Sequence, residues 1–355
     1  MRLLERTLAE IGKPDGSAIA AARKRLDNLT KPLGSLGVLE DLAAKLAGIS
    51  GKTVPPAGWP VDKAVVVMAG DHGVTAEGVS AYPQEVTVQM IANFVRGGAG
   101  INVLARQAGA RVVVVDMGVA GEVADPAVLS RKIRPGTRNI AAGPAMDRED
   151  AVAALEAGIA VASAEVEKGA ALLATGDMGI GNTTPSSAIT AAFAGMPVQT
   201  LVGSGTGIDG ERRRDKVAVV ERALAANSPD PRDGIAVLAA LGGFEIGGLA
   251  GLILGAAARR VPIIIDGFIA GAAALVAARI KREATSFMIA SHLSEEPGHR
   301  ICLELLGLEP VLRLRMRLGE GTGAVLAMNL VEASARIIRE MATFGEAGVS
   351  TAIEG

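Results

Sequence analysis

Short apolar runs alternate with alanine-rich stretches along the middle of this 355-residue chain, and this alternation limits its possible folds more than any other feature. The runs hold three to five residues each, mostly Val, Ile, Leu or Ala. Strands that are apolar on both faces are typical of parallel sheets with helical crossovers. We therefore predict an α/β fold with strands at residues 64–68, 112–115, 171–174, 200–202, 262–265 and 287–290.

Glycine and short polar residues follow each predicted strand. The carboxyl ends of parallel strands share one edge of a sheet, and open α/β sheets bind their ligands at that edge. Glycine there permits a close approach of backbone to ligand. We expect the ligand site where these segments meet: 70–73 (GDHG), 116–118 (DMG), 176–179 (GDMG), 203–205 (GSG), 266–267 (DG) and 291–292 (SH).

Both ends of the chain carry helical patterns. These cover residues 2–11, 17–29 and 36–46, before a proline-rich linker at 54–60, and again residues 324–347 near the other end. We predict a small helical domain formed by both termini. Its parts are residues 1–59 and 331–355, and a large α/β catalytic domain spans residues 60–330.

Charge and composition exclude nucleic acid as a partner. The chain has 36 basic and 38 acidic residues, a net charge of −2, and only six Phe, one Trp and one Tyr. Nucleic-acid-binding proteins neutralise phosphates with excess basic charge, and those that bind single strands stack the bases on aromatic rings. This chain offers neither feature.

Several features predict a cytoplasmic protein without a membrane span. The N-terminus is charged and lacks the apolar stretch of a signal peptide. The single cysteine, Cys302, cannot form an internal disulfide and is predicted to be a buried, inert thiol. Residues 235–258 carry one charge, Glu245, but glycines interrupt them throughout. We interpret them as buried core helices.

Two glycine-rich segments are candidates for phosphate binding. Residues 205–210 (GTGIDG) match the G-x-G-x-x-G pattern of dinucleotide sites, which is a weak signal in a chain with 45 glycines. Lys216 follows on the next helix, where residues 212–214 are three arginines that we interpret as a solvated face. Residues 179–184 (GIGNTT) add amides and hydroxyls after another strand. Together the two segments favour a phosphorylated small molecule.

Other catalytic devices are not indicated. Asp71, His72, His292 and His299 form no ligand-like cluster, so we expect hydrogen-bonded loop residues and no metal. The segment GKT at 51–53 lacks the first glycine of a Walker A loop, and no G-x-S-x-G elbow is present.

Glu320 is the strongest candidate for a catalytic carboxylate. It lies in residues 317–323 (RLGEGTG), just before a predicted helix. A glutamate at a helix start is also favoured by the helix dipole alone. Three alternating glycines and a threonine exceed what such a start requires, so we favour a ligand-facing general base.

Together these segments resemble the nicotinate-nucleotide–dimethylbenzimidazole phosphoribosyltransferase family of cobalamin (vitamin B12) biosynthesis. The similarity runs through nearly the whole chain. It is carried, in order, by residues 31–37 (KPLGSLG), 69–74 (AGDHGV), 78–87 (GVSAYPQEVT), 179–187 (GIGNTTPSS), 203–209 (GSGTGID), 242–245 (GGFE), 266–268 (DGF) and 319–323 (GEGTG).

The resemblance implies a Rossmann-like parallel six-stranded sheet flanked by helices, and a homodimer. It implies transfer of ribose-phosphate from nicotinate mononucleotide to dimethylbenzimidazole, giving α-ribazole phosphate and nicotinate, with no metal or organic cofactor. It places the general base on Glu320 and an assisting acid on Asp177, where the family usually has glutamate. The implied base-binding residues are Ser80, Tyr82, Gln89 and Leu318. The implied phosphate- and ribose-binding residues are Gly179, Gly181, Asn182, Thr183, Gly203, Gly205, Thr206 and Lys216.

Two alternatives stay open at this point. One is a non-catalytic homologue that binds an azole or a nucleotide, with Asp177 as the sign of lost activity. The other is an NAD-dependent dehydrogenase that uses residues 205–210, although no acidic residue about twenty positions later suits a ribose.

Overall fold

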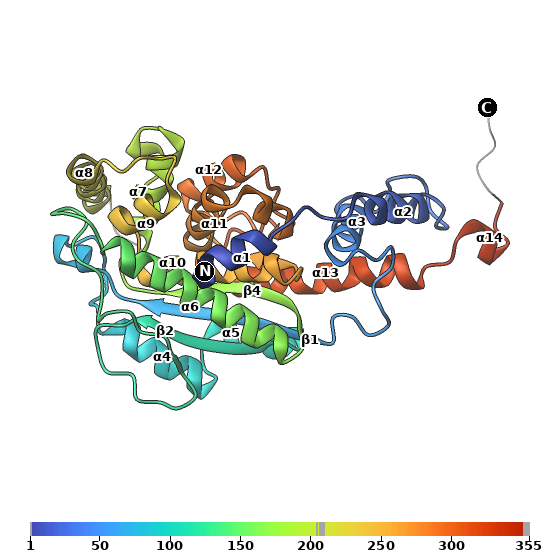
Figure 1. Cartoon of the computed structure of the whole chain (residues 1–355), viewed down its shortest axis with the longest axis horizontal. Coiled ribbons are helices and arrows are strands. Elements are labelled where there is room, and N and C mark those ends of the chain that lie inside the picture. The colour runs from blue at the N-terminus through green and yellow to red at the C-terminus, as the bar shows by residue number, and fades with distance from the viewer. Residues whose placement is uncertain (1, 204, 206–209, 351–355) are drawn as a thin grey trace.

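A parallel sheet forms the centre of the computed structural model, which describes residues 2–203, 205 and 210–350 (Figure 1). Among these residues the sheet has six strands in the order β3-β2-β1-β4-β5-β6. Every pairing is parallel. The predicted α/β class is confirmed. The strands are β1 (Asp62–Gly70), β2 (Arg111–Gly118), β3 (Leu129–Ser130), β4 (Ala170–Met178), β5 (Ile263–Ile265) and β6 (Met288–Ala290).

The predicted strand at 200–202 is wrong. Its first residue ends a 3-10 turn, η2 (Val198–Thr200), and the Thr200 hydroxyl donates to the carbonyl oxygen of Pro197 at 2.7 Å. The segment therefore satisfies its polar groups locally, and β5 occupies the place beside β4. The sixth strand is β3, whose two residues are too short a run to stand out in the sequence.

The two faces of the sheet bury separate apolar clusters. Alternate residues of β1 point to opposite sides, so Val66 and Met68 join one cluster while Val65 and Val67 join the other. The first cluster includes residues of α1 (Leu3–Glu10), α6 (Arg148–Glu167), α7 (Thr183–Ala194), α8 (Gly210–Asn227), α9 (Gly234–Leu241), α10 (Phe244–Ala258), α11 (Phe268–Ile280) and α12 (Pro297–Leu306). The second includes residues of α3 (Val38–Ser50), α4 (Val86–Arg96), α5 (Gly100–Ala108) and α13 (Thr322–Glu340).

The long apolar stretch at 235–258 forms the two helices α9 and α10, as interpreted from the sequence. Helix α10 lies against α6 and against the sheet, and Glu245 in its first turn is fully buried. No helix among the described residues has the combined length and apolarity needed to cross a membrane.

Helices from both ends of the chain pack together at one end of the molecule, where α2 (Gly16–Asp27), α3 and α14 (Phe344–Ala347) extend beyond the sheet (Figure 1). Their small apolar cluster joins Leu26 and Ala47 to Ile338 of α13. The Arg25 side chain donates to the carbonyl oxygen of Ile338 at 2.7 Å. The division at 59/60 and 330/331 stays a prediction. Helix α13 continues across the boundary at 330/331. Helix α1, which was assigned to the small domain, packs against α6 and α10 of the large one.

Candidate active site

A pocket of about 710 Å³ opens at the carboxyl edge of the sheet, and four of the six segments predicted to form the ligand site contribute to it. Residues 70–73 and 116–118 do not line it, and Asp71 lines a separate cavity. Its walls come from the segments that follow β4, β5 and β6, from helix α4 and from the turn before α13. Among the described residues its lining is Tyr82, Val86, Met90, Asp177, Met178, Gly179, Ile180, Gly181, Asn182, Thr183, Gly205, Gly267, Phe268, Ile269, His292, Ser294, Glu296, Arg317, Leu318, Gly319 and Glu320.

Glu320, the predicted base, is held in an uncommon backbone conformation in the pocket wall. Its φ is +63°, and the flanking Gly319 and Gly321 have φ values of +82° and +89°. Non-glycine residues rarely adopt this left-handed region. A Cβ atom on Gly176 of β4 would lie 2.6 Å from the Glu320 carbonyl oxygen. Glycine at position 176 therefore lets the turn contact the end of the sheet.

The Glu320 carboxylate is buried, with 6% of the residue exposed. Its Oε2 accepts a hydrogen bond of 3.2 Å from the backbone N–H of Ile101, in the first turn of α5. Burial raises the pKa of the carboxyl above its usual 4.5, the Ile101 N–H opposes this, and the charge of Asp266 adds to it. The result is a carboxylate with increased proton affinity beside an open pocket.

Asp177, the second predicted catalytic residue, lies at the end of β4. Its Oδ2 accepts a hydrogen bond of 2.9 Å from the side-chain amide of Asn182, while Oδ1 is buried without a partner among the described residues. Burial, together with the negative charge of Asp266, raises the pKa of Asp177 to about 8 despite the Asn182 hydrogen bond. At neutral pH this side chain is therefore a carboxylic acid with a proton to donate.

The predicted base-binding residues are only partly brought together. Tyr82 and Leu318 line the pocket with exposed fractions of 55% and 60%, beside Met90. Ser80 is adjacent, where its hydroxyl accepts the backbone N–H of Tyr82 at 3.1 Å. Gln89 lines a separate cavity of about 430 Å³ that also includes Asp71. In this structure Gln89 does not line the pocket that it was predicted to line, whereas its neighbour Met90 on α4 does.

Most of the predicted phosphate-binding residues meet on one side of the pocket. Gly179, Gly181, Asn182, Thr183 and Gly205 all line it. The buried Lys216 ammonium donates to the Thr183 hydroxyl at 2.6 Å. Burial lowers the pKa of Lys216 to about 8, and the Glu296 carboxylate opposes this. Gly203 packs against Glu296, and Thr206 lies outside the described residues.

Comparison with known proteins agrees with this arrangement. A sequence profile described as "Phosphoribosyltransferase" matches residues 11–349. The nicotinate-nucleotide–dimethylbenzimidazole phosphoribosyltransferase of Desulforamulus reducens is 58% identical over 351 residues, 99% of each chain, and that of Desulforudis audaxviator is 57% identical over 353 residues, again 99% of each. The crystal structure of the Thermus thermophilus enzyme of the same name has a TM-score of 0.90 and 50% identity. That match covers 95% of this chain and 100% of the other.

The chain belongs to the nicotinate-nucleotide–dimethylbenzimidazole phosphoribosyltransferase family. The family and the enzyme class predicted from the sequence, a phosphoribosyltransferase of cobalamin nucleotide-loop assembly, are confirmed. The dehydrogenase alternative loses its structural basis, because the segment before Gly205 is a turn and not the strand that a dinucleotide-binding loop requires.

Two charged residues of this phosphoribosyltransferase pocket were missed in the sequence. The Glu296 carboxylate accepts the backbone N–H of Gly205 at 2.9 Å, and the Arg317 guanidinium donates to the Gly205 carbonyl oxygen at 2.9 Å. Glu296 precedes helix α12, far along the chain from the glycine-rich segment that it contacts. Within one sequence, no local pattern links these positions.

The histidines behave as hydrogen-bonded residues, as predicted. His72 Nε2 lies 2.8 Å from Glu245 Oε1, and both side chains are buried. His299 Nδ1 accepts the backbone N–H of Ser294 at 3.0 Å. Across residues 2–203, 205 and 210–350, no group of three or more His, Cys, Asp or Glu side chains is placed to hold a metal ion. Cys302 is buried, and burial raises the pKa of its thiol to about 12, so it is an inert thiol as expected.

Proposed function

We propose that this chain transfers the phosphoribosyl group of nicotinate mononucleotide to dimethylbenzimidazole, with Glu320 as the general base. The observation that carries the proposal is the Glu320 carboxylate itself. It is buried from bulk solvent and held in place by the Ile101 N–H, and it lines the wall of the pocket. That pocket has an apolar side and a side rich in amide groups. The names of the relatives supply the two substrates.

The apolar side of the pocket suits the flat aromatic base. Tyr82, Met90 and Leu318 offer a ring, a thioether and a branched aliphatic group around the mouth of the pocket. A benzimidazole placed there presents its ring N–H toward polar groups deeper in the pocket. We propose that Ser80 supports Tyr82 through its hydroxyl, and that Gln89 acts on the base only after a change of rotamer.

The opposite side suits a phosphate. Backbone and side-chain donors of residues 179–183 follow β4, and Lys216 supplies one positive charge beside Thr183. Helix α7 begins at Thr183, so its amino end adds a favourable dipole for an anion. We propose that this side, with Gly203, Gly205 and Thr206, anchors the ribose 5-phosphate.

The chemistry then needs one proton transfer and one substitution. Glu320 removes the proton from one benzimidazole nitrogen, and the lone pair of the other nitrogen attacks the anomeric carbon of the ribose. The bond from that carbon to the pyridinium nitrogen breaks, and its electron pair leaves with nicotinate. Attack on the face opposite a β-linked leaving group yields α-ribazole phosphate. Positioning of the two substrates contributes several kcal/mol, in line with the roughly 7–11 kcal/mol available from proximity.

In this proposal Asp177 acts as a neutral carboxylic acid and not as a second carboxylate. Because its pKa is raised to about 8, the side chain is protonated at neutral pH and donates a hydrogen bond. It lies beside Gly319, next to the base. We propose that it donates to substrate oxygen and keeps a second negative charge away from Glu320.

The proposal includes a homodimer and a cytoplasmic location, both of which rest on the sequence. The resemblance supplies the dimer, and the single cysteine fits a reducing compartment. Light scattering on the purified chain tests the dimer directly, since one copy has a mass of 36.0 kDa.

The decisive experiment follows product formation from nicotinate mononucleotide and dimethylbenzimidazole by mass spectrometry. We expect wild-type chain to release nicotinate and α-ribazole phosphate. We expect Glu320→Gln to lower kcat by about 10²- to 10⁴-fold, the range typical of a general base, with unchanged binding of nicotinate mononucleotide. Glu309→Gln, at an exposed position, is the matched control and keeps wild-type turnover.

Two other results would contradict the proposal. Unchanged turnover in Glu320→Gln would remove Glu320 from the role of base. Saturable binding of both substrates to the wild-type chain without any nicotinate release would favour the non-catalytic homologue.

A further inference from the structure

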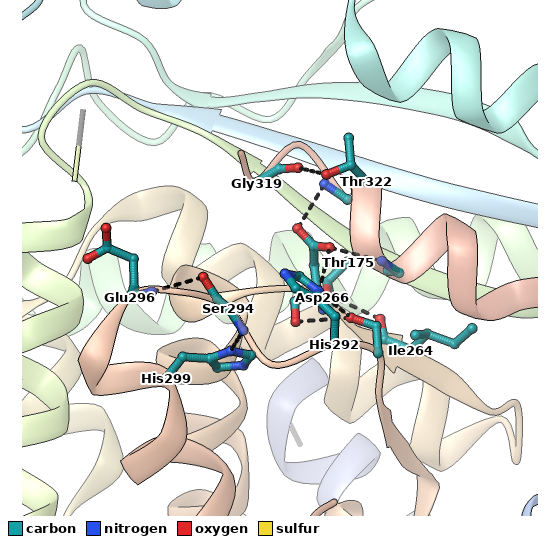
Figure 2. A network of polar contacts seen from close by, with 12 residues as sticks. Thr175, Ile264, Asp266, His292, Ser294, Glu296, His299, Gly319 and Thr322 are labelled. Atoms are coloured by element: carbon teal, nitrogen blue, oxygen red, sulfur yellow. Dashed lines mark hydrogen bonds and ion pairs between the residues drawn. The ribbon is translucent and has the colours of Figure 1, made fainter. Parts of the chain in front are cut away.

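A buried carboxylate that the proposed reaction does not use lies directly behind Glu320. Asp266 follows strand β5 and is 1% exposed. Its Oδ2 accepts the backbone N–H of Gly321 at 3.1 Å, and its Oδ1 accepts the backbone N–H of Ala324 at 2.9 Å. Figure 2 shows Asp266 between the turn that contains Gly319 and Thr322 and the segment that contains His292.

The turn that Asp266 contacts has a conformation that needs support. Gly319, Glu320 and Gly321 are three consecutive residues with positive φ. A non-glycine residue in this region is strained and persists only where its surroundings fix it. Within the turn, the Thr322 hydroxyl donates to the Gly319 carbonyl oxygen at 2.8 Å. The Asp266 carboxylate then ties the turn and the first residues of α13 to the sheet.

Asp266 is itself fixed by the neighbouring strands. Its backbone N–H donates to the Thr175 hydroxyl at 3.0 Å, and that hydroxyl donates to the Ile264 carbonyl oxygen at 3.2 Å. The Ser291 hydroxyl lies 3.2 Å from the Asp266 carbonyl oxygen and donates to it. Groups from β4, β5 and the segment after β6 therefore lie around Asp266 (Figure 2). Asp266 in turn holds the turn that contains Glu320.

We propose that Asp266 is a positioning residue for the reaction: its buried carboxylate holds the left-handed turn that directs Glu320 into the pocket. This inference rests on the proposed function for its kinetic consequences. Its structural content, the dependence of the Glu320 conformation on Asp266, stands on the two hydrogen bonds alone.

Asp266 also affects the pKa of Glu320, and the groups around the two carboxylates show how. Glu320 faces Asp177 of β4, Asp266 and the amino end of α5 at Ile101. Asp266 faces Asp177, the N–H groups of Gly267, Gly321 and Ala324, and His292, whose Nδ1 lies 3.9 Å from its Oδ1. Burial raises the pKa of Asp266, while His292 and the three N–H groups oppose the rise. Removal of this negative charge is expected to lower the pKa of Glu320.

The test compares Asp266→Asn with a matched control, Asp116→Asn. Asp116 is also a buried aspartate, 2% exposed, at the carboxyl end of a strand, and it accepts the Val119 N–H at 2.9 Å. Its other carboxylate oxygen pairs with Lys132, away from the Glu320 turn. We expect Asp266→Asn to lower kcat/KM by about 10²-fold, the loss typical of a misplaced catalytic group, and to move the rising limb of its pH profile to lower pH. Asp116→Asn is expected to keep the wild-type midpoint even if its melting temperature falls.

A second pair of variants applies if Asp266→Asn does not fold. Thr175→Val removes the hydroxyl that accepts the Asp266 N–H, and Thr175→Ser retains it. We expect Thr175→Val to lower kcat without changing the KM for nicotinate mononucleotide. We expect Thr175→Ser to retain the wild-type kcat. A structural role alone would lower the activity of Thr175→Val only in proportion to its content of folded protein and would leave kcat per folded molecule unchanged.

The crystal structure of Asp266→Asn separates this inference from the proposed function. We expect the turn to lose the positive φ at Glu320 and the contact of Glu320 with Ile101. If the wild-type chain forms no product, the proposed function fails, but this structure still decides the positioning role. An unchanged turn together with an unchanged pH profile overturns the inference.

Discussion

Asp177 shows how far the surroundings of one residue determine its chemistry. The same side chain would be ionised on the surface, yet burial beside Asp266 raises its pKa to about 8. We predict that activity falls as the pH rises through about 8, because ionisation removes the donor and adds a charge next to Glu320. Asp177→Asn supplies an N–H donor that does not ionise, so it should keep its kcat at pH 9 relative to pH 7 when nicotinate mononucleotide is saturating. Saturation removes the effect of weaker binding through Lys216, whose pKa is also lowered to about 8. An equal fall in this kcat in both proteins would contradict the role of Asp177.

The same residue gives a prediction for stability. The unfolded chain releases the Asp177 proton above pH 3.8, whereas the folded chain keeps it up to about pH 8. Unfolding therefore releases a proton in this interval, and the contribution of Asp177 to stability becomes less favourable as the pH rises. We expect Asp177→Asn to raise the melting temperature at pH 8 and to leave it nearly unchanged at pH 3. Scanning calorimetry at the two pH values measures the difference.

At the scale of elements, the packing of α6 against α10 depends on glycine. A Cβ atom on Gly158 of α6 would collide with the carbonyl oxygen of Gly248 in α10, and one on Gly251 would collide with that of Leu155. We predict that Gly158→Ala lowers the free energy of unfolding by about 1–3 kcal/mol, because the helices must separate. Gly16→Ala, in the first turn of α2 with no atom within 4 Å of the added Cβ, is the control. Denaturant titration of both variants decides the point, and equal stability would refute the packing argument.

The elements also show why sequence patterns succeed or fail. Five strands and the terminal helices were predictable because each buries a continuous apolar run or a periodic face. The segment at 200–202 has the composition of a strand, but Pro197 and the Thr200 hydroxyl give it a local turn. Strand β3 consists of two residues that pair with Val115 and Asp116. That pairing depends on the tertiary structure, and so no local sequence pattern indicates it.

For the whole molecule, the predictable part of the site is the part that lies in glycine-rich segments after a strand or before a helix. Glu320, Asp177 and residues 179–183 could be found because glycine and polar residues follow β4 and precede α13. Asp266 and Arg317 also lie in segments that the sequence singled out, but their contacts with Gly321 and Gly205 depend on the tertiary fold. Glu296 acts on Gly205 from a loop that no sequence pattern indicated. That Gln89 lines another cavity, while Met90 lines the pocket, was likewise not evident from the sequence.

The pocket joins three separate parts of the chain, so filling it is expected to stabilise the whole fold. Lys216 of α8 contacts Thr183 of α7, and Glu296 before α12 contacts Gly205. At 100 times its Kd, a ligand adds about 2.7 kcal/mol to the free energy of unfolding. We predict that nicotinate mononucleotide raises the melting temperature of the wild-type chain by several degrees and that Lys216→Met abolishes the rise. Because the pKa of Lys216 is lowered to about 8, the rise should also shrink above that pH. Lys52→Met, at an exposed position after α3, is the control, and equal stabilisation of both variants would remove Lys216 from the phosphate site.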